Sequence, residues 1–273
     1  VLFVPGDVFA GRGPDPVLQQ IEDFGDGTIS ANDCFRPVSR YFDRISRPEH
    51  LLTALPRALR TMTDPADCGP VTLAFCQDVQ AEAYDWPEAF LAPKVWRIRR
   101  PGLDQAEVRA VADLIRAAKR PVIVAGGGVQ YSKATDALAA FAERHGIPVV
   151  ETQAGKSALP WDHPWNLGPV GVTGASSANA VCEVADLVIG VGTRFQDFTT
   201  GAWALFKAPG RRLVSINVAA HDAMKHGAEP LNGDALLALA ALSHALRDAV
   251  APPPPAGIKA AWFAAVDPLT APP

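Results

Sequence analysis

Glycines in the second half of the sequence are the residues best placed to bind a phosphate group. Gly126, Gly127 and Gly128 follow an apolar run and precede a helical pattern, so a phosphate could approach their backbone at a helix N-terminus. The dinucleotide-binding fingerprint requires a third glycine three residues after its second, and Tyr131 occupies that position. The triplet therefore predicts either a nucleotide-binding turn or a tight turn that binds nothing.

Two cations and an acid follow predicted strands nearby. Lys156 and Arg194 each come after a strand pattern, and ligands of doubly wound sheets bind at the carboxyl ends of strands. Together they could hold a phosphate or a carboxylate, or they could form a solvated rim or an ion pair between domains. Glu151 ends the second strand at about the distance expected of a ribose-binding acid.

Composition excludes several classes of protein. The 273 residues carry a net charge of -4, with 48% hydrophobic and 20% charged residues, as in a globular protein with a sizeable core. No charge block indicates nucleic acid or an anionic membrane as a partner, and no apolar run approaches the length of a membrane span.

The reactive side chains outside the glycine region form no recognisable motif. The four cysteines lack zinc-ligand spacing, so we expect reduced thiols in the cytoplasm and no bound metal. His163, His221 and His226 have no nucleophile motif beside them, so we expect surface or packing histidines.

Strand and helix patterns alternate from Asp104 onward, which predicts a parallel sheet with crossover helices. The expected strands cover residues 121–125, 147–150, 185–191 and 213–218. The expected helices cover residues 104–118, 133–145 and 235–249. We predict that residues 104–249 form one α/β domain, with a six-stranded, mostly parallel, doubly wound Rossmann-like sheet and helices on both faces.

The first hundred residues have a less regular pattern. It predicts a short strand at 2–4, a surface excursion at 10–33, a helix at 48–62, a buried strand at 71–75 and a linker at 80–102. At the other end, Pro252–Pro255 predict a stiff extended spacer, and residues 256–273 are too few for a domain.

Several short motifs in the second half occur in a specific order. After the glycine triplet come GIPV at 146–149, LG-x-x-G-x-x-G at 167–174, ANA at 178–180, ADL at 185–187 and G-x-RF-x-D at 192–197. This order resembles the central domain of thiamine-diphosphate enzymes such as acetohydroxyacid synthase, in which the region holds flavin, a nucleotide or nothing. The segment GPVTLAFCQDVQAEAYDWP at 69–87 resembles the closing strand of their pyrimidine-binding domain.

The resemblance implies three parts. Residues 1–97 would be the C-terminal part of the pyrimidine-binding domain, itself α/β, with a linker, and residues 98–251 the central domain. Residues 252–273 would lead into a further domain.

Two segments resemble one branch of the family more closely. NDCFRPVSRYFDRISRPEHL at 32–51 and QDVQAEAYDWP at 77–87 are similar to the trihydroxycyclohexanedione hydrolases of myo-inositol breakdown. Membership implies thiamine diphosphate and Mg2+ in the intact enzyme, which would be a homodimer or homotetramer. Its substrate would be a cyclic 1,2-diketone derived from a polyol, and cleavage of a carbon–carbon bond would open the ring to 5-deoxy-glucuronate. The alternatives are a carboligase or decarboxylase like acetohydroxyacid synthase, or a non-catalytic nucleotide-binding or structural module.

The resemblance also implies where the catalytic residues lie. The family's catalytic Glu would lie upstream of Val1 and its metal motif beyond Pro273, so we expect the chain alone to be inactive. Gly25-Asp26-Gly27 resembles the magnesium motif, but residues 50–58 contain no Asn partner, which predicts a surface turn instead.

A pair of residues remains as a candidate substrate contact. Phe35 and Arg36 stand where acetohydroxyacid synthase has a Phe-Gln pair facing the cofactor. Because Arg stands in place of Gln, a shared role cannot be carried over: the guanidinium is positively charged and only donates hydrogen bonds, whereas the Gln amide is neutral and also accepts them. Arg36 therefore predicts either a substrate contact or an exposed arginine before Pro37.

Overall fold

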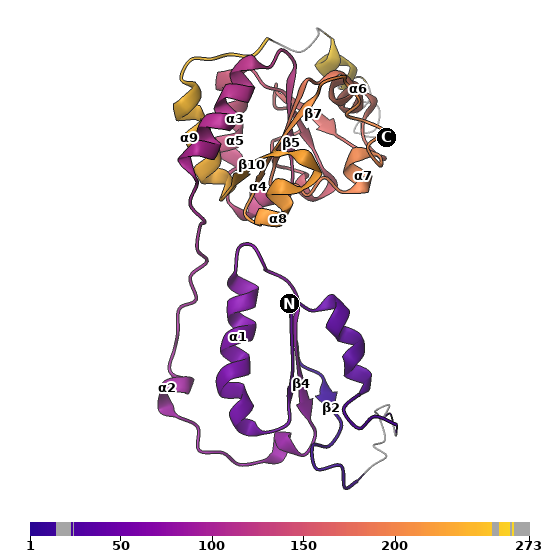
Figure 1. Cartoon of the computed structure of the whole chain (residues 1–273), viewed down its shortest axis with the longest axis vertical. Coiled ribbons are helices and arrows are strands. Elements are labelled where there is room, and N and C mark those ends of the chain that lie inside the picture. The colour runs from indigo at the N-terminus through magenta and orange to yellow at the C-terminus, as the bar shows by residue number, and fades with distance from the viewer. Residues whose placement is uncertain (15–22, 24, 253–256, 263, 265–273) are drawn as a thin grey trace, which may run out of the picture. The chain divides into compact units, whose positions relative to one another are not determined.

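The computed structural model describes residues 1–14, 23, 25–252, 257–262 and 264. The chain divides into two compact units, Val1–Arg99 and Arg100–Pro273 (Figure 1). The predicted spacer at Pro252–Pro255 lies almost wholly outside the described residues, and so does most of 256–273. Within the described part of the chain, no helix is long and apolar enough to cross a membrane.

The first unit is built on a parallel sheet of short strands around β4 (Val71–Cys76). On one side β4 pairs with β3 (Tyr41–Ile45), and on the other with β1 (Leu2–Phe3) and then β2 (Gly6–Asp7). Helix α1 (Leu51–Thr63) packs on this sheet and passes through Pro56 without a break. The sequence pattern missed β3, because Tyr-Phe-Asp-Arg-Ile does not alternate between apolar and polar residues.

The second unit contains six parallel strands in the order β10-β9-β8-β5-β6-β7. In chain order this is the strand arrangement of the Rossmann fold, which confirms the predicted sheet. The strands are β5 (Pro121–Ala125), β6 (Val149–Glu151), β7 (Asn166–Pro169), β8 (Leu187–Val191), β9 (Arg212–Asn217) and β10 (Glu229–Asn232). The two edge strands, β7 and β10, were not located from the sequence because their residues, NLGP and EPLN, have the composition of turns.

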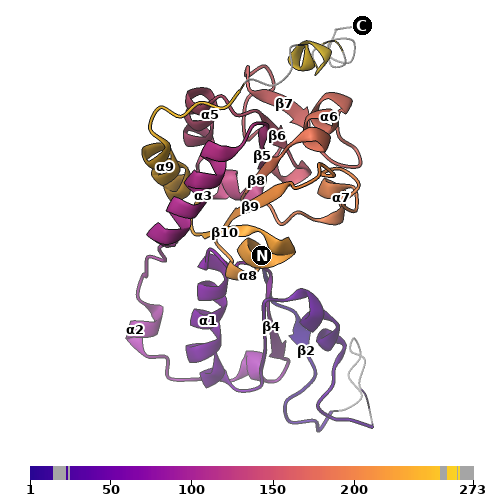
Figure 2. The same ribbon diagram turned by 45° about the horizontal axis from the view of Figure 1, so that its top comes forward.

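Helices cover both faces of this sheet (Figure 2). One face carries α3 (Gln105–Ala117), α5 (Thr135–His145) and α9 (Ala235–Leu246), and the other carries α6 (Ser176–Val184) and residues 195–206. The short helices α4 (Gly127–Tyr131), α7 (Asp197–Thr200) and α8 (Ala220–Met224) follow strands β5, β8 and β9.

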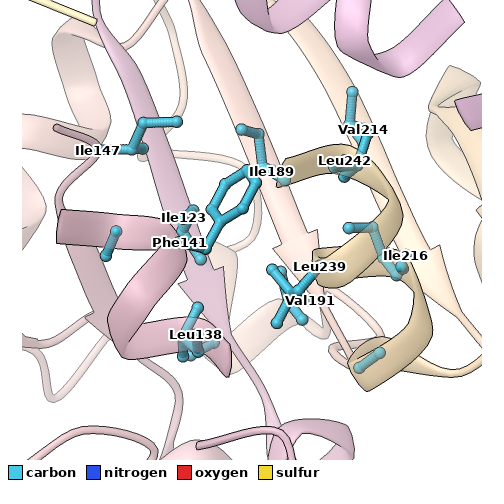
Figure 3. Packing of buried hydrophobic residues seen from close by; sticks show 14 of the residues in the cluster. Ile123, Leu138, Phe141, Ile147, Ile189, Val191, Val214, Ile216, Leu239 and Leu242 are labelled. Carbon is cyan, nitrogen blue, oxygen red and sulfur yellow. The ribbon is translucent and has the colours of Figure 1, made fainter. Parts of the chain in front are cut away.

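Burial of each central strand on both faces explains its continuous apolar run. In β5, Ile123 contributes to the core under α5 and α9, whereas Val122 and Val124 contribute to the core under α6. Figure 3 shows Phe141 of α5 and Leu239 of α9 packed over Ile123 and its neighbours. A sheet held from both sides in this way gives a rigid frame for the loops at its carboxyl edge.

Candidate functional site

The glycine turn after β5 lies against the turn after β8, at the point where the strand order reverses. Gly126 N–H donates to Val191 O at 2.9 Å, and Gly128 N–H donates to Gly192 O at 3.1 Å. A methyl group on Gly126 would lie 2.3 Å from Gly192 O, and one on Gly128 would lie 2.5 Å from Gly192 Cα. Backbone packing between two turns therefore requires these glycines, and two of the three N–H groups already have protein acceptors.

The predicted cations lie at the same carboxyl edge. Lys156 follows β6 and Arg194 follows β8, on either side of β5, and both side chains are exposed. Gln130, in α4, donates a side-chain hydrogen bond to the carbonyl of Lys156. Among the described residues, no ion pair includes either cation. Their charges are thus presented to solvent at the edge where such sheets bind ligands.

Glu151 does not serve as the ribose-binding acid that its position indicated. Its side chain is buried, and its carboxylate accepts the N–H of Leu159 at 2.9 Å. Burial raises the pKa of Glu151, and this outweighs the opposing effect of hydrogen bonds from residues 157–159 and Asn166. The carboxylate organises the loop that follows β6 instead of facing a ligand.

Gly25-Asp26-Gly27 forms a local turn, as predicted. Asp26 Oδ1 accepts from the backbone N–H of Thr28 at 2.9 Å and from its hydroxyl at 2.6 Å. In the part of the chain that the structure describes, no group of three or more His, Cys, Asp or Glu side chains could hold a metal ion. Gly25-Asp26-Gly27 and its surroundings therefore do not fit the magnesium-bound diphosphate that the family resemblance implies.

Phe35 and Arg36 lie on a short 3-10 helix, Ala31–Val38, which begins at a capping box formed by Ser30 and Asp33. The Phe35 ring contacts Phe3 of β1 edge-on, with centroids 4.7 Å apart. Arg36 donates from Nε to Asp33 Oδ1 at 2.5 Å, and its guanidinium stacks 4.1 Å from the centre of the Phe42 ring. The exposed Arg36 side chain is thus held in one orientation.

Sequence reasoning missed the charged network behind this helix. Arg44, in β3, donates from Nε to Asp7 Oδ2 at 2.6 Å and from Nη2 to Asp33 Oδ2 at 2.9 Å. Asp7 ends β2 and is fully buried. Burial alone would raise the pKa of Asp33, but hydrogen bonds from Ser30, Arg36 and Arg44 lower it to about 2. The available signal was Arg44, a cation in the largely half-buried segment Tyr41–Ile45.

The histidines and cysteines are placed as packing or surface groups. His163 accepts a hydrogen bond from the backbone N–H of Trp165 at 3.2 Å, and His221 is exposed. The His226 ring packs edge-on against the Trp203 ring, with centroids 4.8 Å apart. All four cysteines are free: Cys34 and Cys68 are exposed, and Cys76 and Cys182 are buried. Burial and nearby carboxylates raise the pKa of Cys76 to about 11.

Comparison with known proteins identifies the second unit. Residues 108–242 match the family model described as "Thiamine pyrophosphate enzyme, central domain". The second unit is a thiamine pyrophosphate enzyme central domain. A solved structure from Mycobacterium smegmatis, assigned as a thiamin diphosphate-dependent enzyme, is similar with a TM-score of 0.62 and 27% identity. The similarity covers 78% of this chain and 40% of that protein.

Three curated relatives of this chain carry the name "3D-(3,5/4)-trihydroxycyclohexane-1,2-dione hydrolase". The protein from Geobacillus thermodenitrificans is 52% identical over 92% of this chain and 39% of its own length. The Clostridium perfringens relative is 52% identical over 86% of this chain and 37% of its own length. The Bacillus cereus relative is 50% identical over 91% of this chain and 38% of its own length. The chain therefore spans less than two fifths of these relatives.

Proposed function

We propose that this chain is part of a thiamine-diphosphate-dependent hydrolase that opens a cyclic 1,2-diketone by cleaving a carbon–carbon bond. The observation that carries the proposal is the identity of 50–52% to relatives named as hydrolases of such a dione, extending over both units. Hydrolysis of the bond between two adjacent carbonyl carbons consumes one water. One carbonyl carbon becomes a carboxylic acid and the other an aldehyde, so a trihydroxycyclohexanedione gives a deoxy sugar acid such as 5-deoxy-glucuronate.

The residues of this chain have supporting roles in the proposed enzyme. Thiamine diphosphate would supply the carbanion chemistry when bound, and Mg2+ would hold the diphosphate through ligands outside this chain. Phe35 and Arg36 are the proposed substrate contacts, since both lie on a helix whose start is held by hydrogen bonds from Arg44 to Ser30 and Asp33. The free cysteines support a reducing cytoplasm as the location.

The proposal is tested by comparing the 273-residue chain with the full-length protein. We expect the full-length protein to open the dione with added thiamine diphosphate and Mg2+, and to bind the cofactor in calorimetry. The chain alone should do neither, because its described residues supply no set of metal ligands. Micromolar cofactor binding by the chain alone would place the cofactor site within these residues. Turnover of pyruvate instead of the dione would assign the carboligase or decarboxylase activity.

For the carboxyl edge of the second unit, we propose that the glycine triplet is a packing element. Close contact with Gly192 accounts for Gly126 and Gly128 without a ligand. Lys156 and Arg194 remain candidates to bind an anion such as a nucleotide phosphate. Titration of the chain with ADP tests this directly, and binding that disappears in the K156A/R194A double variant would establish the site.

A further inference from the structure

Arg36 is held far more firmly than its exposure requires. Its side chain is 54% exposed, yet its Nε is bound to Asp33 and its guanidinium plane lies over Phe42. An exposed ion pair alone contributes little and leaves a long side chain free to change rotamer. Here the acceptor itself is fixed, and this determines where the remaining Arg36 N–H groups point.

Asp33 is fixed by three donors. Its Oδ2 accepts the backbone N–H of Ser30 at 2.7 Å and Nη2 of Arg44 at 2.9 Å, while Oδ1 accepts from Arg36. The bond to Ser30 closes the capping box, so the same carboxylate defines the start of the helix that carries Arg36.

Arg44 is fixed in turn by the interior of the first unit. Besides Asp33 it contacts the buried carboxylate of Asp7 at 2.6 Å, the carbonyl of Thr28 at 2.9 Å and the hydroxyl of Ser30 at 2.9 Å. Asp7 and Arg44 stand near the carboxyl ends of β2 and β3. The charges alternate along the network, from the buried carboxylate of Asp7 through Arg44 and Asp33 to the exposed guanidinium of Arg36.

We propose that Asp33 and Arg44 are positioning residues, which hold the Arg36 guanidinium in one orientation to bind the oxygens of the ring-opened acid and its precursor. This inference rests on the proposed function. A neutral diketone becomes a carboxylate when the ring opens, and a guanidinium binds a carboxylate through paired hydrogen bonds. The oriented arginine would therefore bind the product acid more strongly than the neutral ring.

The test uses the full-length enzyme and three variants, D33N, R36K and the control E49Q. Glu49 forms a 2.6 Å pair with Arg47 in the same unit but does not belong to the Asp7–Arg44–Asp33 network. We expect D33N and R36K to weaken inhibition by glucuronate, a stable six-carbon sugar acid, roughly 10- to 100-fold. The KM for the neutral dione should rise less than the inhibition constant for glucuronate, and E49Q should behave as wild type.

A crystal structure of the D33N enzyme separates this inference from the proposed function. We expect Arg36 to leave the Phe42 ring in D33N, whether or not the enzyme opens the dione. Arg36 still stacked on Phe42, or unchanged glucuronate inhibition alongside a lowered Tm, would show that Asp33 is only structural and would overturn the inference. A wild-type enzyme that does not open the dione, but in which Arg36 moves on D33N substitution, would refute the proposed function and retain the positioning role.

Discussion

A methyl group added at Gly128 tests the contact between the turns after β5 and β8. It would lie 2.5 Å from Gly192 Cα, about 1 Å inside an ordinary carbon–carbon contact. The obstacle is backbone, so no side-chain rotation relieves it. Separating the turns also breaks the Gly128–Gly192 hydrogen bond, which contributes about 1 kcal/mol. With the cost of overpacking, we expect G128A to lower the free energy of unfolding of the second unit by about 2–4 kcal/mol.

The matched control is G102A. Gly102 belongs to the same unit, has no atom within 4 Å of an added methyl group and does not have a left-handed backbone. That substitution should be neutral or stabilise by roughly 0.5 kcal/mol. Urea unfolding gives the change in free energy of unfolding for each variant. Hydrogen exchange of the α9 amides shows that the change belongs to the second unit. The reasoning is refuted if the free energies of unfolding of G128A and G102A differ by less than about 1 kcal/mol, roughly the limit of such measurements.

Three further outcomes follow from the buried charges and the thiols. R44M should destabilise the first unit by about 3–5 kcal/mol in urea unfolding, because it leaves the buried Asp7 carboxylate unpaired; a change under 1 kcal/mol would contradict this. Burial raises the pKa of Glu151, so its contribution to stability is present below its ordinary pKa and is lost as the pH rises through the folded value. The stability of wild type relative to E151Q should therefore fall as the pH rises above 4.5, the ordinary pKa of a Glu side chain, and a rise would refute the assignment. Cys34 and Cys68 should react with a thiol reagent in the native chain, and the two buried thiols only after unfolding; prompt native labelling of all four would be inconsistent with this packing.

The central sheet could be predicted because its inner strands are buried on both faces. A strand such as Pro121–Ala125, covered by helices on each side, must be apolar throughout, and this leaves a clear mark in the sequence. Strands β7 and β10 pair on one side only, so backbone hydrogen bonds to one neighbour suffice and their sequences carry Gly and Pro. Their place in the sheet depends on tertiary pairing that no local pattern reveals.

The candidate sites were predicted less completely, for reasons that differ from residue to residue. Residue type and position placed Lys156 and Arg194 correctly at one edge, because parallel strands bring their carboxyl ends together. The same reasoning misread Glu151, since position alone does not say whether a carboxylate faces a ligand or its own loop. The Asp7–Arg44 pair joins two strands distant in sequence, and its significance depends on burial.

The contact between the two turns also has a consequence for the order of folding. Gly192 lies far along the chain from Gly128. The turn after β5 therefore lacks its packing partner, the turn after β8, until β8 has been synthesised and has paired with β5. Contacts between such distant segments form slowly, because a long loop must first be ordered. The glycine turn therefore reaches its native shape late, after the helices on either side of it can already form. A substitution there would chiefly speed unfolding and leave the early steps of folding unchanged.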